Sequence, residues 1–285
     1  MPFISLIAPK GTLDPALVSS LQGAFGATGD ALWLSPDEAA EFPVAACPSN
    51  FEDVKKTVHH QKIDLNYIED TNRRKSLLIA DMDMTMIGQE CIDELADEAG
   101  VGARVAAITA RAMNGELNFE EAVLERVGLM KGLDANVIAR VLETRITLAP
   151  GGKALVQTMK KHGANTALVS GGFIQFAERV AADLGFDEAH ANRLIIEDGQ
   201  LTGDVARPIL GRDAKVEQLE RLSPDTSQAI AIGDGANDLG MIQRAGMGVA
   251  VHAKPVVAAA APYAINHGDL TACLFLQGYS IADFA

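Results

Sequence analysis

Two carboxylates separated by a single residue stand directly after an apolar run. The run Leu77 to Ala80 ends at Asp81 and Asp83, in the segment LLIADMDMTMIGQE. Two like charges close together are costly, so a buried strand gains nothing from such an ending. Side chains two apart on an extended segment project to the same side, which lets both carboxylates face one ligand. One can attack an electrophile while the other carries a proton, provided that their environments separate their pKa values.

A second acidic loop offers the other half of a cation site. Asp234 and Asp238 flank Gly235 in the segment AIAIGDGAND, again after an apolar run. Carboxylates, carbonyls and water suit Mg²⁺, which usually bridges to a substrate phosphate. The alternative is that these aspartates only cap helix N-termini. Two acidic loops at strand ends exceed what capping requires, so we predict Mg²⁺ as the cofactor.

Two further segments offer groups that bind phosphate. Ser170, Gly171 and Gly172 supply a hydroxyl and unhindered backbone N–H groups near an expected helix N-terminus. By itself this segment suits an ordinary tight turn equally well. Lys215, in GRDAKVEQL, would add a fixed positive charge, although a single lysine on a helix is usually exposed to solvent.

The elements that must position these residues have the rhythm of a parallel sheet. Three short apolar runs, each ended by a polar loop and followed by a helix-like segment, lie at 76–85, 166–173 and 229–238. This alternation predicts βαβ units, with a further strand at 248–251 and a helix at 255–261. Ligands of open parallel sheets bind beyond the carboxyl ends of the strands, so the three loops are expected to meet. The predicted fold class is α/β, with a Rossmann-like doubly wound parallel sheet.

The insertion after the first of these strands has a helical pattern. Residues 88–147 contain no convincing strand, and their apolar residues recur at spacings of three and four, which is typical of amphipathic helices. We expect a helical cap, approximately 88–147, over the ligand edge of the sheet. Further along, Asp198 and Gly199 stand between two apolar pieces and predict a β-hairpin.

The N-terminal quarter is expected to be a separate small domain. Its first 45 residues have weak signals of an α/β layout, and residues 46–75 are interpreted as its tail and a linker helix. The adjacent His59 and His60 fall on this charged helix and are expected to be solvated rather than to act as ligands. We therefore divide the chain into residues 1–70 and residues 71–285.

Composition limits the classes of partner. The 285 residues carry a formal net charge of −14, and nucleic-acid binding needs a basic footprint that is not visible here. The sequence contains no run of 18 apolar residues, so no membrane span is predicted. The start MPFISLIAPKG lacks the pattern of a signal peptide. Cys47, Cys91 and Cys273 lack metal-ligand spacing and are expected to be reduced thiols of a cytoplasmic protein.

The motif series as a whole resembles a known family. DxDxT at a strand end, a strand ending in SGG, a lysine and then GDGxND is the series of the haloacid-dehalogenase (HAD)-like phosphatases. Within that superfamily, residues 76–275 resemble the phosphoserine phosphatases, through DMDMTMIGQECIDELADEAG, RAMNGELNFEEAVLERV, LVSGGF, ANRL, LTGDV and AIGDGANDLGMI. Residues 1–70 resemble them only loosely, where bacterial members often carry an ACT-like domain.

The resemblance implies catalytic and metal-binding roles for five residues. Asp81 would be the nucleophile and form an aspartyl phosphate. Asp83 would protonate the serine leaving oxygen and then act as base on the hydrolytic water. Mg²⁺ would be held by Asp81, the Asp83 carbonyl and Asp234, with Asp238 behind them. Lys215 would bind phosphate and neutralise the charge on Asp81.

The resemblance also implies how the substrate is bound. The substrate-binding residues would be Ser170, Gly171 and Asn237 around the phosphate, and Glu90, Arg126, Met113 and Phe119 in the cap. Glu90 would meet the substrate ammonium and Arg126 its carboxylate, a pairing that favours a planar guanidinium. Met113 and Phe119 would close over the small side chain, the alternative being that they belong to the helical core.

These roles imply Mg²⁺-dependent hydrolysis of O-phospho-L-serine to L-serine and phosphate, the last step of serine biosynthesis. Serine or another amino acid as an effector at the N-terminal domain, and a homodimer, would be further partners. The family usually has serine where this chain has Met84, which removes a hydroxyl and adds bulk beside the general acid.

One alternative function is that of an enzyme for another small phosphomonoester. The other is a non-catalytic sensor, against which the intact Asp81, Asp83, Lys215 and Asp234 argue.

Overall fold

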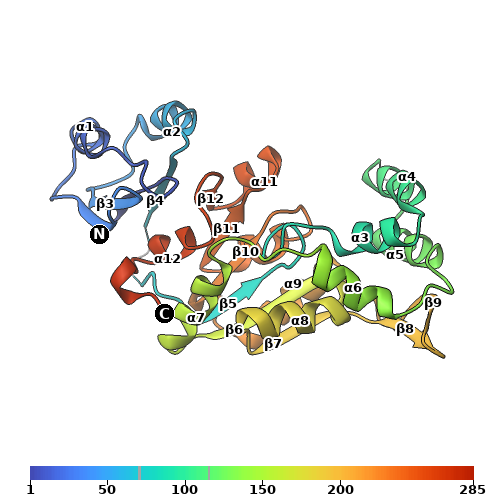
Figure 1. The fold of residues 1–285 in the computed structure, drawn as a ribbon. Helices are drawn as coiled ribbons and strands as arrows, with labels where there is room; N and C mark the ends of the chain where they lie inside the picture. Colours follow the sequence, from blue (N-terminus) through green and yellow to red (C-terminus); the bar gives the residue numbers. More distant parts are fainter. Residues whose placement is uncertain (70–71, 115) are drawn as a thin grey trace.

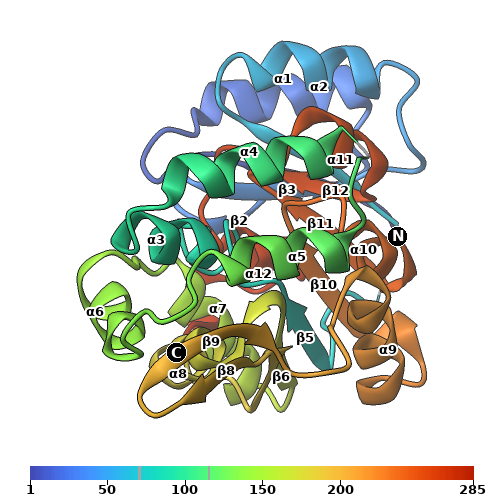
Figure 2. The same ribbon diagram turned by 90° about the vertical axis from the view of Figure 1, so that its right-hand side faces the viewer.

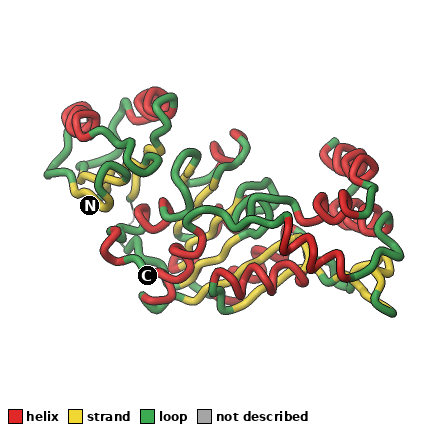
Figure 3. Tube along the Cα trace, viewed as in Figure 1, coloured by secondary structure: helices red, strands yellow, loops and turns green. Residues whose placement is uncertain are grey.

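The described residues form two large sheets, a two-stranded hairpin and a separate group of helices. The computed structural model describes residues 1–69, 72–114 and 116–285, without the side chain of Met113. A small N-terminal sheet and the group of helices lie at opposite ends of a larger sheet that is itself flanked by helices (Figure 1, Figure 3). Within the described residues, no helix is both long and apolar enough to cross a membrane.

The N-terminal sheet is antiparallel, with two helices on one face (Figure 1). Its elements are β1 (Phe3–Ile7), α1 (Pro15–Phe25), β2 (Leu32–Ser35), β3 (Ala39–Pro43), α2 (Phe51–His59) and β4 (Asp64–Ile68), and the strand order is β2-β3-β1-β4. Asp14 caps α1, and the rings of Phe25, Phe42 and Phe51 pack together in the core beneath the helices. Residues 46–75 include the tail of this domain, as predicted, but α2 is not a linker helix, because it packs against β4, which completes the sheet.

The larger sheet is parallel throughout. Its strands are β5 (Leu77–Ala80), β6 (Asn165–Phe173), β7 (Glu188–Asn192), β10 (Ala229–Gly233), β11 (Met247–Val251) and β12 (Tyr263–Ile265), in the order β12-β11-β10-β5-β6-β7. Every residue of the central β5 is buried, as expected of a parallel strand covered on both faces. The strands expected from the apolar runs are confirmed. The structure adds β7 and β12, of which β7, with the sequence EAHAN, has too little apolar character to be predicted.

Helices cover both faces of this sheet, which makes it doubly wound. The flanking helices are α7 (Gly152–Lys161), α8 (Ile174–Leu184), α9 (Arg212–Leu222), α10 (Leu239–Arg244), α11 (Pro255–Ala260) and α12 (Ala272–Leu276). Leu78 and Ala80 of β5 belong to the core that includes α7 and α8. Leu77 and Ile79 belong to the opposite core, which includes residues of α9 and α10. Alternate residues of one strand therefore fill two cores.

The inserted helices lie across the end of the sheet, as predicted for a cap. They are α3 (Cys91–Glu98), α4 (Gly102–Met113), α5 (Phe119–Gly128) and α6 (Asn136–Thr144). The chain leaves and re-enters the core where Ile87 and Leu148 form an antiparallel bridge. Figure 2 shows α4 and α5 in front of the carboxyl ends of the strands. The hairpin predicted at Asp198 and Gly199 is confirmed as β8 (Leu194–Glu197) and β9 (Gln200–Val205), and β9 packs against α5.

Two buried polar side chains of β4 join the small sheet to the large one. The carboxylate of Asp64 accepts hydrogen bonds from the backbone N–H groups of Asn266, His267 and Gly268, at 2.8–3.0 Å. The amide of Asn66 donates to the carbonyl of Ala264 and accepts from its N–H. Polar side chains of one sheet thus pair with the backbone beside β12 of the other.

Candidate active site

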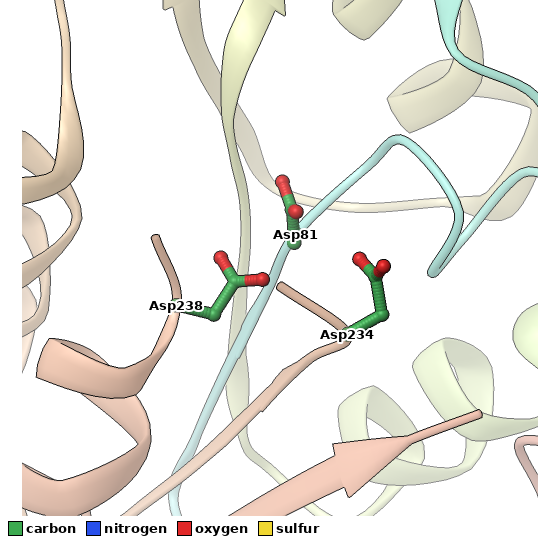
Figure 4. Close-up of side chains that lie close together, drawn as sticks. All are labelled: Asp81, Asp234 and Asp238. Atoms are coloured by element: carbon green, nitrogen blue, oxygen red, sulfur yellow. The ribbon is translucent and has the colours of Figure 1, made fainter. Parts of the chain in front are cut away.

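Three aspartates from two strand ends converge beyond the carboxyl edge of the large sheet. Asp81 follows β5, Asp234 follows β10, and Asp238 immediately precedes α10. One carboxylate oxygen from each lies within 4.8 Å of the other two. Figure 4 shows the three carboxylates extending to the same side. The two acidic loops therefore meet, as expected of loops that follow strands of one parallel sheet.

Lys215 of α9 reaches into this cluster and is almost completely buried. Its Nζ lies 2.6 Å from Asp81 Oδ1 and 2.5 Å from Asp238 Oδ1. The two carboxylates raise the pKa of Lys215 against the effect of burial, so the side chain stays charged. Burial raises the pKa of Asp81, while Lys215 opposes that rise. The lysine is therefore not the solvent-exposed side chain that its sequence position alone would favour.

The charge of the cluster fits a divalent cation. Three carboxylates and one ammonium leave a formal charge of −2 in a buried space. Hard carboxylate oxygens are the ligands that Mg²⁺ prefers. Thr85 donates to Asp234 Oδ1 at 3.3 Å and holds that carboxylate from the side. The residues present therefore fit Mg²⁺ in both donor type and charge.

Asp83 has a different environment from Asp81, although only one residue separates them. Its Oδ1 is buried and has no hydrogen-bond partner among the described residues. Burial, reinforced by the charge of Glu90, raises the pKa of Asp83 to about 7. A carboxyl group with that pKa can carry a proton at neutral pH and also give it up. The two carboxylates thus have different surroundings, since Asp81 is paired with Lys215 while Asp83 Oδ1 has no partner among the described residues.

The segment Ser170 to Gly172 lies at the carboxyl end of β6 and faces Asp83. Gly172 N–H donates to Ser170 Oγ at 2.8 Å. A Cβ on Gly172 would lie 3.0 Å from Asp83 Oδ2 and 3.1 Å from Ser170 Oγ, so only glycine fits without displacing one of them. The tight-turn alternative is wrong, because the segment continues the strand through Phe173. Its position beside Asp83 suits a group that binds phosphate.

Asn192 fixes this segment and was not assigned a role from the sequence. The side chain is buried, and its amide donates to the carbonyls of Gly171 and Leu210, at 2.9 and 3.0 Å. Its Oδ1 accepts from the N–H of Leu210 at 2.6 Å. Asn192 therefore ties the end of β6 to the loop that leads into α9 and Lys215. The motif ANRL contains this residue, but nothing in its sequence reveals the two loops it joins.

The cap brings Phe119 onto the core beside the glycines. A Cβ on Gly171 would lie 3.2 Å from Phe119 Cζ, and one on Gly211 would lie 3.3 Å from Phe119 Cδ1. The ring is 41% exposed, so it is not a helical-core residue. It lies beside the end of β6 and the loop that precedes α9. The side chain of Met113, expected to act with it, lies outside the described residues.

Glu90 and Arg126 place opposite charges on the cap side of the site. Burial raises the pKa of Glu90, and the charge of Asp234 raises it further. Burial lowers the pKa of Arg126, and the charges of Asp93 and Glu90 oppose this effect. Arg126 Nε donates to Ala122 O, which orients the guanidinium along α5. The cap therefore offers one anion and one cation to a ligand.

Two residues of the loops lie further out. Asn237 is exposed, and its amide oxygen packs over Gly235, where a Cβ would collide with it. Met84 has a left-handed backbone with φ of 55°, and its side chain is 46% exposed. It lines a cavity of about 370 Å³ together with Thr147, Leu148 and His267. The bulk that Met84 adds thus extends into this outer cavity.

The site defines a hydrolase of a known class. Residues 78–243 match the haloacid dehalogenase-like hydrolase family, and the chain belongs to that family. Relatives to which the chain is similar include phosphoserine phosphatases. The chain is 43% identical over 232 residues to the phosphoserine phosphatase of Haemophilus influenzae, which covers 79% of this chain and 74% of the relative.

Solved structures extend the similarity to the whole chain. A probable phosphoserine phosphatase from Vibrio cholerae has a TM-score of 0.83 and 30% identity, covering 99% of this chain and 88% of that one. The match includes the N-terminal sheet. A substrate-bound phosphoserine phosphatase complex has a TM-score of 0.65 and 40% identity, covering 70% of this chain and 97% of that one.

Proposed function

We propose that the protein is a Mg²⁺-dependent phosphoserine phosphatase that hydrolyses O-phospho-L-serine through an aspartyl-phosphate intermediate. One observation carries the proposal: Asp81 is paired with Lys215, while Asp83, two residues away, has a pKa of about 7. The first is suited to attack and the second to move protons. The names of its relatives support the choice of substrate.

In the first step, a carboxylate oxygen of Asp81 attacks the phosphorus atom. The bond from phosphorus to the serine oxygen breaks, and protonated Asp83 gives its proton to that oxygen. Lys215, Ser170 and Gly171 would face the charge on the phosphoryl oxygens, where phosphoryl transfer is most sensitive to stabilisation. Serine leaves, and Asp81 carries the phosphoryl group.

In the second step, Asp83 acts in the opposite sense. Now ionised, it takes a proton from a water molecule, whose oxygen attacks the phosphorus atom. The bond to Asp81 breaks, phosphate is released and Asp83 is again protonated. The same carboxyl group serves both steps because its pKa lies near neutral pH.

The cation would be held by Asp81, the carbonyl of Asp83 and Asp234, with Asp238 beside them. When bound, it neutralises the carboxylates and the phosphate oxygens in the transition state. Asp238 would act mainly by positioning Lys215, because its shortest contact is with the Nζ of that lysine. Thr85 would keep Asp234 turned towards the site.

The cap would recognise the amino-acid end of the substrate. Glu90 would contact the ammonium and Arg126 the carboxylate, while Phe119 would close over the short side chain and Asn237 would reach the phosphate. In this proposal residues 71–285 form the phosphatase domain, with the cap at approximately 88–147, and residues 1–70 form an ACT-like domain. The reaction would be the last step of serine biosynthesis in the cytoplasm.

Phosphate release from several substrates tests the proposal. We expect turnover of O-phospho-L-serine with Mg²⁺, little with phosphothreonine or sugar phosphates, and none after chelation by EDTA. Asp81→Asn should abolish turnover. Near-full activity of that variant, or a preference for a sugar phosphate, would refute the proposal.

A cap variant tests substrate recognition separately. Arg126→Ala should lower kcat/KM for phosphoserine at least 100-fold, because a charged hydrogen-bonded pair is worth several kcal/mol. Turnover of p-nitrophenyl phosphate, which has no carboxylate, should change little. Arg111→Ala, which removes an exposed arginine from the same cap, is the matched control. Equal losses on both substrates would exclude the role given to Arg126.

A further inference from the structure

A cavity separate from the catalytic site lies between the N-terminal sheet and the phosphatase core. Its volume is about 730 Å³, within the range of pockets that hold small molecules. One wall is α2, and the other is the segment that runs from the end of β11 to the end of β12. Neither domain alone encloses it.

The walls of this interdomain cleft collect basic side chains in an otherwise acidic protein. The chain has a formal net charge of −14 and six histidines. Four of those histidines and two lysines line the cleft, with one acidic residue: His59, His60, His252, His267, Lys55, Lys56 and Glu52. The rest of the lining is mainly small and apolar, as in Ala258 and Ala259. Lysines and ring N–H donors gathered beside a short apolar wall suit an anionic small molecule with a compact body.

Two of the histidines face each other across the domain boundary. Nε2 of His267 lies 3.1 Å from Nδ1 of His59, and their ring centroids are 4.6 Å apart. Burial lowers the pKa of His267, the charges of His59 and His252 lower it further, and Asp64 opposes them. An anion in the cleft would accept hydrogen bonds from ring N–H groups and would favour the protonated form of either ring.

His252, which also lines the cleft, has an unusual backbone conformation. It is a non-glycine residue with φ of 47°, in the left-handed region, and its N–H donates to Ile265 O at 2.7 Å. Backbone conformations of this kind cluster at ligand sites, because the surrounding structure must hold them. His252 and His267 also line the outer cavity that contains Met84 and Thr85. The cleft is therefore a neighbour of the loop that carries the catalytic aspartates.

We propose that the interdomain cleft is a binding site for a small anion that carries a phosphate or carboxylate group. Lys55, Lys56, His59 and His267 contact the charged group, and the alanines of α11 contact the rest of the molecule. The site is distinct from the catalytic centre and does not depend on the substrate proposed above. Because its walls come from two domains, a bound molecule contacts both the N-terminal domain and the phosphatase core and stabilises their association.

Histidine NMR signals test this proposal with controls inside the chain. The Cε1–H signals are assigned by single His→Gln variants and followed at constant pH 6.5 while inorganic phosphate or succinate is added to protein freed of metal. We expect the signals of the four cleft histidines to shift and saturate, while those of His162 and His190, which lie elsewhere, stay fixed. The anion whose shifts saturate at the lower concentration shows whether the site prefers a phosphate or a carboxylate group. No shift, a parallel shift of all six signals, or the same shift with chloride at equal ionic strength would overturn the proposal.

A charge-matched pair of variants gives a second test. The double variant Lys55→Gln with Lys56→Gln should raise the Kd of the better anion at least fivefold. The double variant Lys10→Gln with Lys62→Gln removes the same charge from exposed positions of the same domain outside the cleft, and should leave the Kd within twofold. Equal changes in the two variants would show a general charge effect and refute a built site.

Discussion

Replacing the general acid should make the metal-free protein more stable while it destroys activity. The side chain of Asp83 has a pKa of about 7 in the folded protein, against an ordinary value of 3.8. A tenfold change in the acid dissociation constant corresponds to about 1.4 kcal/mol. Folding therefore disfavours the ionised form of Asp83 by about 4 kcal/mol. Asp83→Asn removes this charge and keeps the shape of the side chain. Above pH 7 we expect it to raise the free energy of unfolding by up to about 4 kcal/mol.

The sign of the pH dependence follows from linkage. The folded protein binds the Asp83 proton more tightly than the unfolded chain does, so ionisation costs stability as pH rises from about 4 to about 7. The cost is absent below the lower value and complete above the higher one. The advantage of Asp83→Asn over the wild type should therefore grow by about 2 kcal/mol between pH 5.5 and pH 8.5.

Urea denaturation in EDTA at several pH values measures this advantage. Asp53→Asn, at an exposed aspartate of α2, is the matched control and should not reproduce this increase in stability. In the presence of Mg²⁺, Asp83→Asn should lower kcat by a factor of about 10² to 10⁴. The wild type should lose kcat/KM above pH 7, where Asp83 has no proton to donate. A stability difference that is flat with pH, or that shrinks as pH rises, would refute the electrostatic reasoning.

Three other variants probe the geometry. Gly172→Ala should lower kcat about tenfold or more, because the new Cβ meets the carboxylate of Asp83, while Gly23→Ala, with open space around it, should not; equal kinetics for the two would contradict this. Asn192→Ala should lower the free energy of unfolding by about 1–3 kcal/mol, measured in urea, because it leaves buried backbone groups unpaired, and an unchanged midpoint would count against the role of that amide. Met84→Ser should keep or raise phosphoserine turnover, since the methionine side chain extends into the outer cavity; complete loss of turnover would show that Met84 supports the site.

The catalytic loops could be predicted because each follows a short apolar run. The runs before Asp81, Ser170 and Asp234 mark buried parallel strands, and topology alone then brings their ends together. What the sequence does not contain is the contact between loops. That Lys215 bridges Asp81 and Asp238 depends on how α9 packs on the sheet, and no local pattern encodes it.

The N-terminal sheet was harder to predict for a physical reason. The strand β4 has the sequence DLNYI, whose alternating polar residues suggest an exposed face. The polar residues Asp64 and Asn66 are instead buried, because they bind backbone groups near β12, about 200 residues away. Burial of polar side chains is favourable only where partners exist. Those partners are visible only after both sheets have formed, so His59 could not be placed opposite His267 beforehand.

The contact of Asn66 with Ala264 has a consequence for how the chain avoids self-association. β12 is the last strand of the parallel sheet, and an open strand edge is a template on which another chain can add a strand. The side-chain amide of Asn66 takes both the N–H and the carbonyl of Ala264, and Asp64 takes the N–H of Asn266. The N-terminal sheet thereby blocks the edge without extending it. Removing residues 1–70 would uncover a row of free backbone groups and favour aggregation of the catalytic domain.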